Sequence, residues 1–151
     1  MISQAPLCFV LGPLVSGCCL YELYTGKILF SGSDNNGMLK VIQEVKGRFP
    51  KRMLQKAFFA HKHFDADGTS FMHLKTDAAT GQSRVTQIRY ADKPVKDLHH
   101  MLREHTGAKA SHADAAKIKQ LADFIHQCTA LDPQQRAQCD SLLEHPFVKV
   151  E

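Results

Sequence analysis

An almost uncharged apolar stretch, residues 14–25, most constrains what this chain can fold into. The segment LVSGCCLYELYT holds a single charged side chain, Glu22. Its apolar residues fall on two faces of a helical wheel, Leu14, Cys18 and Tyr21 on one and Val15, Cys19 and Leu23 on the other. A helix that is apolar nearly all round belongs in a core. We therefore expect a buried helix from Leu14 to Thr25, ended by Gly26.

The overall composition is that of an ordinary globular domain or a part of a larger one. The chain has 151 residues, 44% hydrophobic and 23% charged, with a formal net charge of +4. Such a mild charge gives no reason to expect direct nucleic-acid binding. The apolar N-terminal stretch has no Lys or Arg before Lys27 and is interrupted by Pro6, Gly12, Pro13 and Gly17. These features argue against a signal peptide or membrane span, so we expect a cytosolic or nuclear protein.

The cysteines predict reduced thiols rather than disulfides or a zinc site. There are five, Cys8, Cys18, Cys19, Cys128 and Cys139. An odd number without C-x-x-C spacing suits neither a disulfide framework nor a tetrahedral zinc site. Reduced thiols are the usual state inside cells.

The segment SDNNGMLKVIQEVKG predicts a second helix, with Ser33 or Asp34 as its N-cap and Gly47 as its end. Its inward stripe is expected to be Met38, Leu39, Ile42 and Val45, and its outward face Lys40, Gln43 and Glu44. A short helix should follow Pro50, because proline suits the first helical position. Further on, FMHLKTD and SRVTQIRY predict two strands joined by a turn at AATGQ. A lone hairpin is marginal in water, so it should lie against the helices or be mobile.

The C-terminal third again predicts helices. The segment PVKDLHHMLREH should turn Val95, Leu98, Met101 and Leu102 inward. After the loose stretch TGAKASH, Ser111 and Asp114 have the spacing of a capping box. Ile118, Leu121, Ile125 and Cys128 follow at helical spacing, and a turn at LDPQQR leads to a last short helix in AQCDSLLEHPFV. The predicted fold is therefore mainly α-helical with a small β-hairpin.

Three patterns suggest binding chemistry, and each has a simpler explanation. FDADGTSF is similar to a calcium loop, but Ser70 and Thr76 occupy the sixth and twelfth positions, which require glycine and glutamate. His61, His63, His99, His100 and His105 have too open a spacing for zinc and read as surface histidines. The basic run of Lys46, Arg48, Lys51, Arg52 and Lys56 could contact phosphates, but the charged outer faces of two helices explain it equally well.

Nucleotide-binding and nucleophilic motifs are absent from the sequence. Gly26-Lys27 lacks the upstream glycine and the following hydroxyl residue of a P-loop, and no G-x-G-x-x-G or G-x-S-x-G occurs. Asp123-Phe124 is followed by Ile125, not by the glycine of a D-F-G metal loop, and lies in the middle of a predicted helix. The residues alone therefore specify no catalytic centre.

Three segments resemble the C-terminal lobe of eukaryotic Ser/Thr protein kinases: GCCLYELYTGKILF, LDPQQR and LLEHPFV. In this comparison G-C-x-L-x-E-L is similar to the central buried helix of the lobe. L-D-P-x-x-R is similar to the turn between its last two large helices, and H-P-F to the end of its final helix. The resemblance implies that residues 14–25 are the centre of a kinase lobe, which explains their apolarity.

Further segments narrow the resemblance to the pre-mRNA-processing (Prp-four) kinases of the cyclin-dependent, MAP and dual-specificity kinase group. These are TGKILF, NNGMLKVIQEVKGRFPKRML and HFDADGTSFMHLKTD. The resemblance implies a partial kinase domain over residues 17–150, preceded by a divergent segment over residues 1–16. Members of this group carry an insert after the helix that resembles NNGMLKVIQEVKG, which corresponds here to about residues 48–105.

The resemblance assigns structural rather than catalytic roles to residues of this chain: Gly17, Glu22, Asp132, Arg136, His145, Pro146 and Phe147. In kinases the Arg136 equivalent pairs with the Glu of an A-P-E motif, so here it should face solvent or find a substitute partner. The buried helix of the family opens with D-x-W-S-x-G, and within residues 12–17 only Gly17 agrees with that pattern. Ser31 also stands where the family usually has proline.

The groups that perform phosphoryl transfer in this family are not found among these residues. The Gly-rich loop, strand lysine, H-R-D base, D-F-G metal ligand and A-P-E segment are all missing from the sequence. A full-length member would use ATP and Mg²⁺ to phosphorylate Ser/Thr of splicing proteins, whereas this chain should hold no cofactor and be inactive alone. We expect a missing N-terminal kinase half, protein partners that include spliceosomal ones, and a nuclear location.

Two alternatives remain at this point. The first is a non-catalytic protein-interaction or scaffolding module that uses residues 48–105 or the apolar N-terminus. The second is a metal-dependent hydrolase that uses the histidines.

Overall fold

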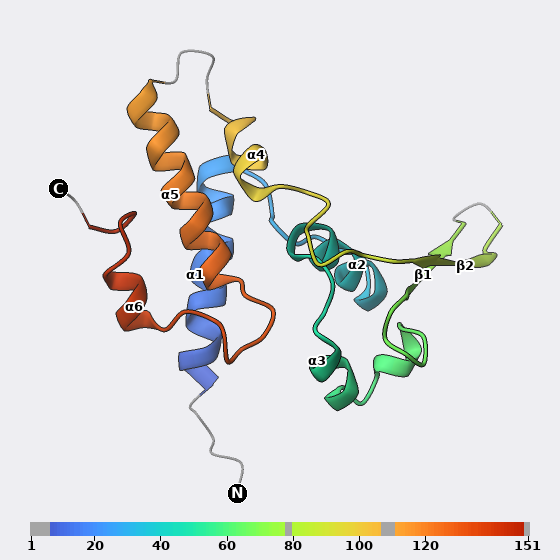
Figure 1. Ribbon diagram of the computed structural model, residues 1–151. Coiled ribbons are helices and arrows are strands. Elements are labelled where there is room, and N and C mark those ends of the chain that lie inside the picture. The colour runs from blue at the N-terminus through green and yellow to red at the C-terminus, as the bar shows by residue number, and fades with distance from the viewer. Residues whose placement is uncertain (1–6, 78–79, 107–110, 150–151) are drawn as a thin grey trace, which may run out of the picture. The chain divides into compact units, whose positions relative to one another are not determined.

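The computed structural model describes residues 7–77, 80–106 and 111–149. These residues form two compact units (Figure 1). One contains the described residues up to Leu29 and from Asp97 onward, and the other contains those between Phe30 and Lys96. The start of the divergent segment, residues 1–6, lies outside the described residues, as do parts of the AATGQ turn and of the TGAKASH stretch.

The first unit is a set of helices packed around α1 and α5. It contains α1 (Leu7–Thr25), α4 (Leu98–Arg103), α5 (His112–Cys128) and α6 (Cys139–Leu143). Helix α1 contacts α4, α5 and α6, and α4 also contacts α5. Phe124, Cys128 and Leu142 form a buried cluster against which Leu20 and Phe147 pack. The predicted helical character of this part of the chain is confirmed.

Helix α1 differs from the prediction in two ways. It begins at Leu7 rather than Leu14 and continues through Pro13, whose ring is fully buried. The second difference is that the helix is not buried all round, because Val15 is 56% exposed and Leu23 is 82% exposed. The described residues cover one face of α1 and leave an apolar face open. Its predicted end is confirmed, since Gly26 has φ +70° and its N–H bonds to the Glu22 carbonyl.

The cap of α5 follows the sequence prediction. The Ser111 hydroxyl accepts from the Asp114 N–H, and the Asp114 carboxylate accepts from the Ser111 N–H, so both halves of the capping box are present. The four residues predicted to face inward on this helix are buried: Ile118, Leu121, Ile125 and Cys128. In the preceding segment Leu98 and Leu102 are buried as expected, but Val95 is 70% exposed, because α4 begins only at Leu98.

The second unit begins with helix α2 (Asn35–Lys46), followed by α3 (Lys51–Lys56) and a 3₁₀ turn (Ala60–Lys62). The predicted caps of α2 are confirmed: the Asp34 carboxylate accepts from the Gly37 N–H at 2.7 Å, and Gly47 has φ +82°. The expectation that Gln43 faces outward is wrong, since its side chain is 1% exposed. Val45 is buried as predicted.

The predicted hairpin is present, and its strand β1 contacts α2. Strand β1 (Phe71–Thr76) pairs antiparallel with β2 (Ser83–Ile88), in a register that matches Phe71 with Ile88 and Thr76 with Ser83. Phe71, the first residue of β1, lies in an aromatic core. The centroid of its ring is 5.5 Å from that of Phe64 and 6.3 Å from that of Tyr90. Burial decreases along β1 toward the turn. The hairpin is therefore anchored at one end, as a lone two-stranded sheet requires.

Residues 91–96 run back along the end of α2. The Arg48 N–H bonds to the Ala91 carbonyl, and the Lys96 N–H bonds to the Glu44 carbonyl. The Glu44 carboxylate lies 2.6 Å from the Lys96 ammonium and 3.3 Å from that of Lys40. Burial alone would raise the pKa of Glu44, but hydrogen bonds from the two lysines bring it below its ordinary value. Separately, none of the helices within the described ranges is long and apolar enough to cross a membrane.

Candidate functional site

The seven residues to which the kinase resemblance assigns a structural role all lie in the first unit: Gly17, Glu22, Asp132, Arg136, His145, Pro146 and Phe147. Gly17 and His145 are buried, and Asp132, Arg136 and Phe147 are partly buried. Glu22 and Pro146 are exposed. Three of the set lie against α5 or its C-cap: Gly17, His145 and Phe147.

Gly17 lies at a close approach of α1 and α5. A Cβ atom added at Gly17 would be 2.7 Å from the Cβ of Cys128 and 3.2 Å from the Cγ2 of Thr129. Real carbon atoms do not approach this closely without van der Waals repulsion. The glycine is therefore required here for close helix packing.

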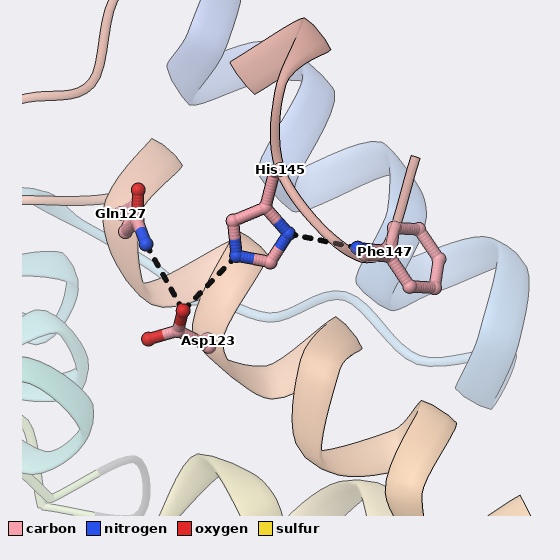
Figure 2. Close-up of polar contacts among 4 residues, drawn as sticks. All are labelled: Asp123, Gln127, His145 and Phe147. Atoms are coloured by element: carbon pink, nitrogen blue, oxygen red, sulfur yellow. Dashed lines mark hydrogen bonds and ion pairs between the residues drawn. The ribbon is translucent and has the colours of Figure 1, made fainter. Parts of the chain in front are cut away.

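A polar cluster joins the end of α6 to the side of α5. Figure 2 shows the His145 ring between the Asp123 carboxylate and the backbone of Phe147. The distance from His145 Nε2 to Asp123 Oδ2 is 3.0 Å, and the Phe147 N–H donates to His145 Nδ1 at 3.1 Å. Gln127, one turn after Asp123, donates its amide to the same carboxylate oxygen at 3.0 Å.

These bonds determine the tautomer of His145 and argue for a structural role. Because Nδ1 accepts a hydrogen bond from a backbone N–H, the ring proton lies on Nε2 and is donated to Asp123. Both ring nitrogens are then occupied, and the ring is 7% exposed. A general base needs a nitrogen that can reach a substrate proton. His145 and Asp123 therefore hold the helices together and do not form a catalytic dyad.

The cluster also shifts the pKa of Asp123. The hydrogen bond from His145, followed in importance by that from Gln127, lowers the pKa of Asp123 below its ordinary value, against an opposing contribution from burial. This role of Asp123 was not predicted, since in the sequence the residue stands out only as part of a pair similar to the start of a D-F-G metal loop. One signal for this role was available in the sequence: Asp123 and Gln127 are four residues apart in a predicted helix, a spacing at which their side chains can bond.

Arg136 finds a substitute partner in the turn that contains it. Its Nε and Nη2 atoms both donate to the Ala130 carbonyl, at 3.1 and 3.0 Å. In the same turn, the Asp132 carboxylate accepts from the Gln134 N–H at 3.0 Å. Burial lowers the pKa of Arg136, and the nearby Cys18 thiol opposes that shift. The Asp132 and Arg136 side chains thus bond to backbone groups of the same turn.

In the second unit, one buried side chain connects α2 to the hairpin. The Asn36 amide donates to the Met72 carbonyl at 2.9 Å and lies 3.0 Å from His63 Nδ1. Its carbonyl oxygen accepts from the Leu74 N–H at 2.9 Å. This role of Asn36 was not predicted, because in the sequence the residue belongs only to the start of a helix and no local signal distinguishes it from Asn35.

The FDADGTSF segment forms a closed polar turn. The Asp65 carboxylate accepts from the backbone N–H of Thr69 and of Ser70, at 2.7 and 3.1 Å, and from the Thr69 hydroxyl at 3.0 Å. Hydrogen bonding, led by Ser70 and reinforced by Thr69, lowers the pKa of Asp65 to about 2. The turn uses this carboxylate to satisfy its own backbone, as Asp does in such turns.

The histidines considered as zinc ligands do not form a cluster. His63 bonds to Asn36, His100 lies 3.5 Å from Glu104, and His105 Nδ1 lies 3.0 Å from the Met101 carbonyl. Among residues 7–77, 80–106 and 111–149, no group of three His, Cys, Asp or Glu side chains is placed to hold a metal ion. Four of the cysteines are free thiols: Cys18, Cys19, Cys128 and Cys139. Burial, which is the main cause, raises the pKa of the Cys18 thiol.

Comparison with known proteins shows which proteins this chain is similar to. No family model matches the chain. It is 39% identical over 132 residues to the serine/threonine-protein kinase prp4 of Schizosaccharomyces pombe, covering 87% of this chain and 27% of that protein. It is 35% identical over 134 residues to the serine/threonine-protein kinase prpf4B of Dictyostelium discoideum, covering 88% of this chain and 16% of that protein.

A third relative is more distant. The serine/threonine-protein kinase AFC3 of Arabidopsis thaliana is 26% identical over 133 residues, covering 88% of this chain and 30% of that protein. The chain thus spans less than a third of the length of each of these relatives. Because these similarities extend over nearly nine tenths of its residues, and its helical fold is consistent with a kinase C-lobe, the chain is a homologue of part of the serine/threonine protein kinases and is similar to their Prp4-type members.

Proposed function

We propose that these residues serve as the C-lobe part of a Prp4-type Ser/Thr kinase and do not transfer phosphate on their own. The observation that carries the proposal is the similarity over 132 residues to the prp4 kinase. Phosphoryl transfer depends on positioning ATP, Mg²⁺ and a hydroxyl nucleophile. The motifs that position them in kinases do not occur in the sequence.

The exposed apolar face of α1 is the surface that we assign to the rest of a kinase domain. Val15 is 56% exposed, Leu23 is 82% exposed, and the Cys19 thiol is also exposed. Apolar side chains gathered on one helix face commonly mark a contact surface. A segment that carries the ATP and Mg²⁺ groups, in the same or another polypeptide, would cover this face and complete the catalytic domain.

A complete kinase that includes these residues would act on splicing proteins. We infer this, together with a nuclear location and spliceosomal partners, from the resemblance to pre-mRNA-processing kinases and from the similarity to prp4 and prpf4B. Its reaction would be transfer of the ATP γ-phosphate to a Ser or Thr hydroxyl.

A phosphate-transfer assay tests the proposal. The purified chain is incubated with labelled ATP, Mg²⁺ and a Ser/Arg-rich protein substrate, beside a heat-killed sample and a complete Prp4-type kinase as positive control. We expect labelling no higher than in the heat-killed sample. Labelling well above it would refute the proposed inactivity of the isolated chain.

The native size of the polypeptide tests the assignment to a larger kinase. An antibody raised against CDSLLEHPFVKVE would detect the protein in extracts of its own cells. A band much heavier than 16.9 kDa is expected if these residues are part of a complete kinase chain. A single band at that mass would require a separate polypeptide to supply the catalytic groups, and co-purification would identify it.

A non-catalytic interaction role is the second candidate. It is favoured by one observation, a pocket in the second unit that is lined mainly by aliphatic, thioether and aromatic side chains. The metal-dependent hydrolase alternative has no comparable support.

A further inference from the structure

Strand β2 is paired on one side only. It forms a two-stranded sheet with β1, and no other described strand lies beside it (Figure 1). In an antiparallel pair, residues whose N–H and C=O face the neighbouring strand alternate with residues whose groups face away from it. The N–H groups of Met72 and Leu74 face away from β2, because they donate to groups outside the hairpin. Gln87 and Val85, which lie opposite them in the register, therefore direct their backbone groups to the outer side of β2.

The outer edge of β1 is closed by the rest of the second unit. The Asn36 side chain accepts from the Leu74 N–H and donates to the Met72 carbonyl, both at 2.9 Å. The Met72 N–H donates to the His63 carbonyl at 2.7 Å. These backbone groups of β1 already have partners, so another strand cannot add there without displacing α2.

The outer edge of β2 is open. Within residues 7–77, 80–106 and 111–149, no group bonds to the outward N–H or C=O of Val85 or Gln87, and all of residues 83–87 are exposed. Proteins usually protect such an edge with a proline, a bulge or a charge, since it is a template for pairing with another chain. The three residues whose backbone faces outward on β2 are uncharged: Ser83, Val85 and Gln87.

We propose that β2 pairs antiparallel with β2 of a second copy of the chain, so that the two hairpins form one four-stranded sheet. The twofold axis passes through Val85, which lies opposite the same residue of the second copy. Addition of a strand to an open edge is a common mode of recognition, in which the backbone provides affinity and the side chains provide specificity.

The order of side chains on β2 fits this self-pairing. With Val85 on the axis, Ser83 lies opposite Gln87 and Arg84 lies opposite Thr86, so each polar side chain meets a polar one without a like charge. Because only outward residues can pair, the register changes in steps that move the axis by one residue. One such step places Arg84 opposite Arg84, which is destabilising, and the other places Val85 opposite Gln87.

The two faces of the hairpin also favour a second copy. Val85 lies directly opposite Leu74 on one face, and the two side chains are 58% and 47% exposed. Pairing brings the Val85 and Leu74 side chains of both copies into one apolar row, which a sheet of more than two strands needs for stability. On the other face Lys75 lies opposite Arg84. The two Arg84 residues become diagonal neighbours about 7–8 Å apart, so the association should strengthen as salt screens them.

The pairing ends at the dimer, because the outer edge of β1 is closed in both copies. The contact involves only a few residues of each chain, far fewer than a standard interface. We therefore expect a weak dimer, with a Kd of about 10–100 μM. The inference uses only residues of the second unit, so it does not depend on the proposed kinase role.

Sedimentation velocity and amide hydrogen exchange of the full chain test the proposal. Across about 5–500 μM protein, the sedimentation coefficient should rise from that of a monomer to that of a dimer and no further. At high concentration the Val85 and Gln87 amides should become protected, whereas those of Arg84 and Thr86, which already face β1, should change little. A monomer at every concentration, a larger assembly, or a dimer without this alternating protection would overturn the proposal.

Charged variants then test the register. Val85→Lys places two lysines opposite each other and should weaken the dimer at least about tenfold, as should Val85→Glu with two glutamates. An equimolar mixture of the two variants should dimerise again, because Lys then lies opposite Glu. A variant that had merely lost its fold would not be rescued by mixing. The matched control, Val95→Lys, makes the same change at an exposed residue outside the hairpin and should dimerise as the wild type does.

The remaining outcomes each decide the question. Circular dichroism spectra of the variants must match the wild type, so that a loss of dimer reports on the edge of β2. Failure of the mixture to dimerise would overturn the twofold pairing at Val85. A dimer that is lost in Leu23→Lys, on the exposed face of α1, but kept in Val85→Lys would place the interface on α1 and overturn the proposal.

Discussion

Replacing Gly17 by alanine tests the packing on which the first unit is built. The new Cβ would lie 2.7 Å from the Cβ of Cys128, whereas non-bonded carbons rest about 3.5–4.0 Å apart. Both carbons are attached directly to helix backbone, so no change of rotamer relieves the contact. The helices α1 and α5 would have to separate by about 1 Å.

The expected cost follows from two opposing effects. Overpacking of a core typically costs about 1–3 kcal/mol, and a backbone-to-backbone clash belongs in the upper part of that range. Alanine in a helix gains about 0.5–1 kcal/mol over glycine, which offsets part of this cost. A net loss of about 1–2 kcal/mol remains, which at about 2–4 °C per kcal/mol lowers the melting temperature by roughly 2–8 °C.

Thermal and urea unfolding of the full chain, followed by far-UV circular dichroism, measures this loss. The matched control is Gly37→Ala in α2, where the nearest atom to the new Cβ is an Asp34 carboxylate oxygen at an ordinary 3.4 Å. This control should be neutral or slightly stabilising. In a Cys128→Gly background, Gly17→Ala should cost less, because one clashing carbon is gone. A Gly17→Ala protein as stable as the wild type would refute the close approach of α1 and α5.

Two substitutions and one titration test further polar groups. Asn36→Ala should destabilise the second unit by roughly 2–3 kcal/mol, because two backbone groups of β1 lose their partner, whereas Asn35→Ala should be neutral; equal urea midpoints would contradict this. His145→Ala should cost about 2–3 kcal/mol in urea unfolding, since it leaves a backbone N–H unpaired and a cavity beside Phe124; an unchanged midpoint would exclude a structural role. The carboxyl carbon of Asp65 should titrate with a pKa of about 2 in NMR spectra. Because this pKa is depressed in the folded protein, the stability contributed by the turn is present above the ordinary pKa of about 3.9 and is lost as the pH falls through the folded value. A titration midpoint at the ordinary pKa would show that the turn does not hold the carboxylate.

Signals that act over a few residues were readable from the sequence. The Asp34 cap, the Gly47 stop and the Ser111–Asp114 capping box all occur where their spacing predicts. A cap needs one side chain within three residues of a free N–H group, and a glycine stop needs only a positive φ. Packing elsewhere in the chain does not change either requirement.

Which side of a helix is buried was predicted less well. Gln43 was expected outside and is 1% exposed, whereas Val95 was expected inside and is 70% exposed. Periodicity finds an apolar face, but burial depends on which elements pack there and where each helix begins. For α1, apolar on both faces, the sequence offered no way to tell the covered face from the exposed one.

The kinase resemblance came from the sequence, but the contacts of its residues came from the fold. The H-P-F motif marks His145, and no sequence pattern identifies Asp123, 22 residues earlier, as its partner. Gly17 is likewise marked by its motif, yet its reason is a contact with Cys128 on another helix. The pocket beside α3 combines side chains from α2, α3 and the segment after α3, and no sequence pattern revealed it.

The presence of most helices, their caps, the hairpin and the kinase resemblance were thus available from residue order, because they depend on short spacings and on recognisable motifs. The covered face of α1, the tautomer of His145, the bracing role of Asn36 and the apolar pocket emerged only with the folded chain. Each depends on atoms that are distant in sequence and are brought together by packing, where distances of a few tenths of an ångström separate a stable contact from a clash.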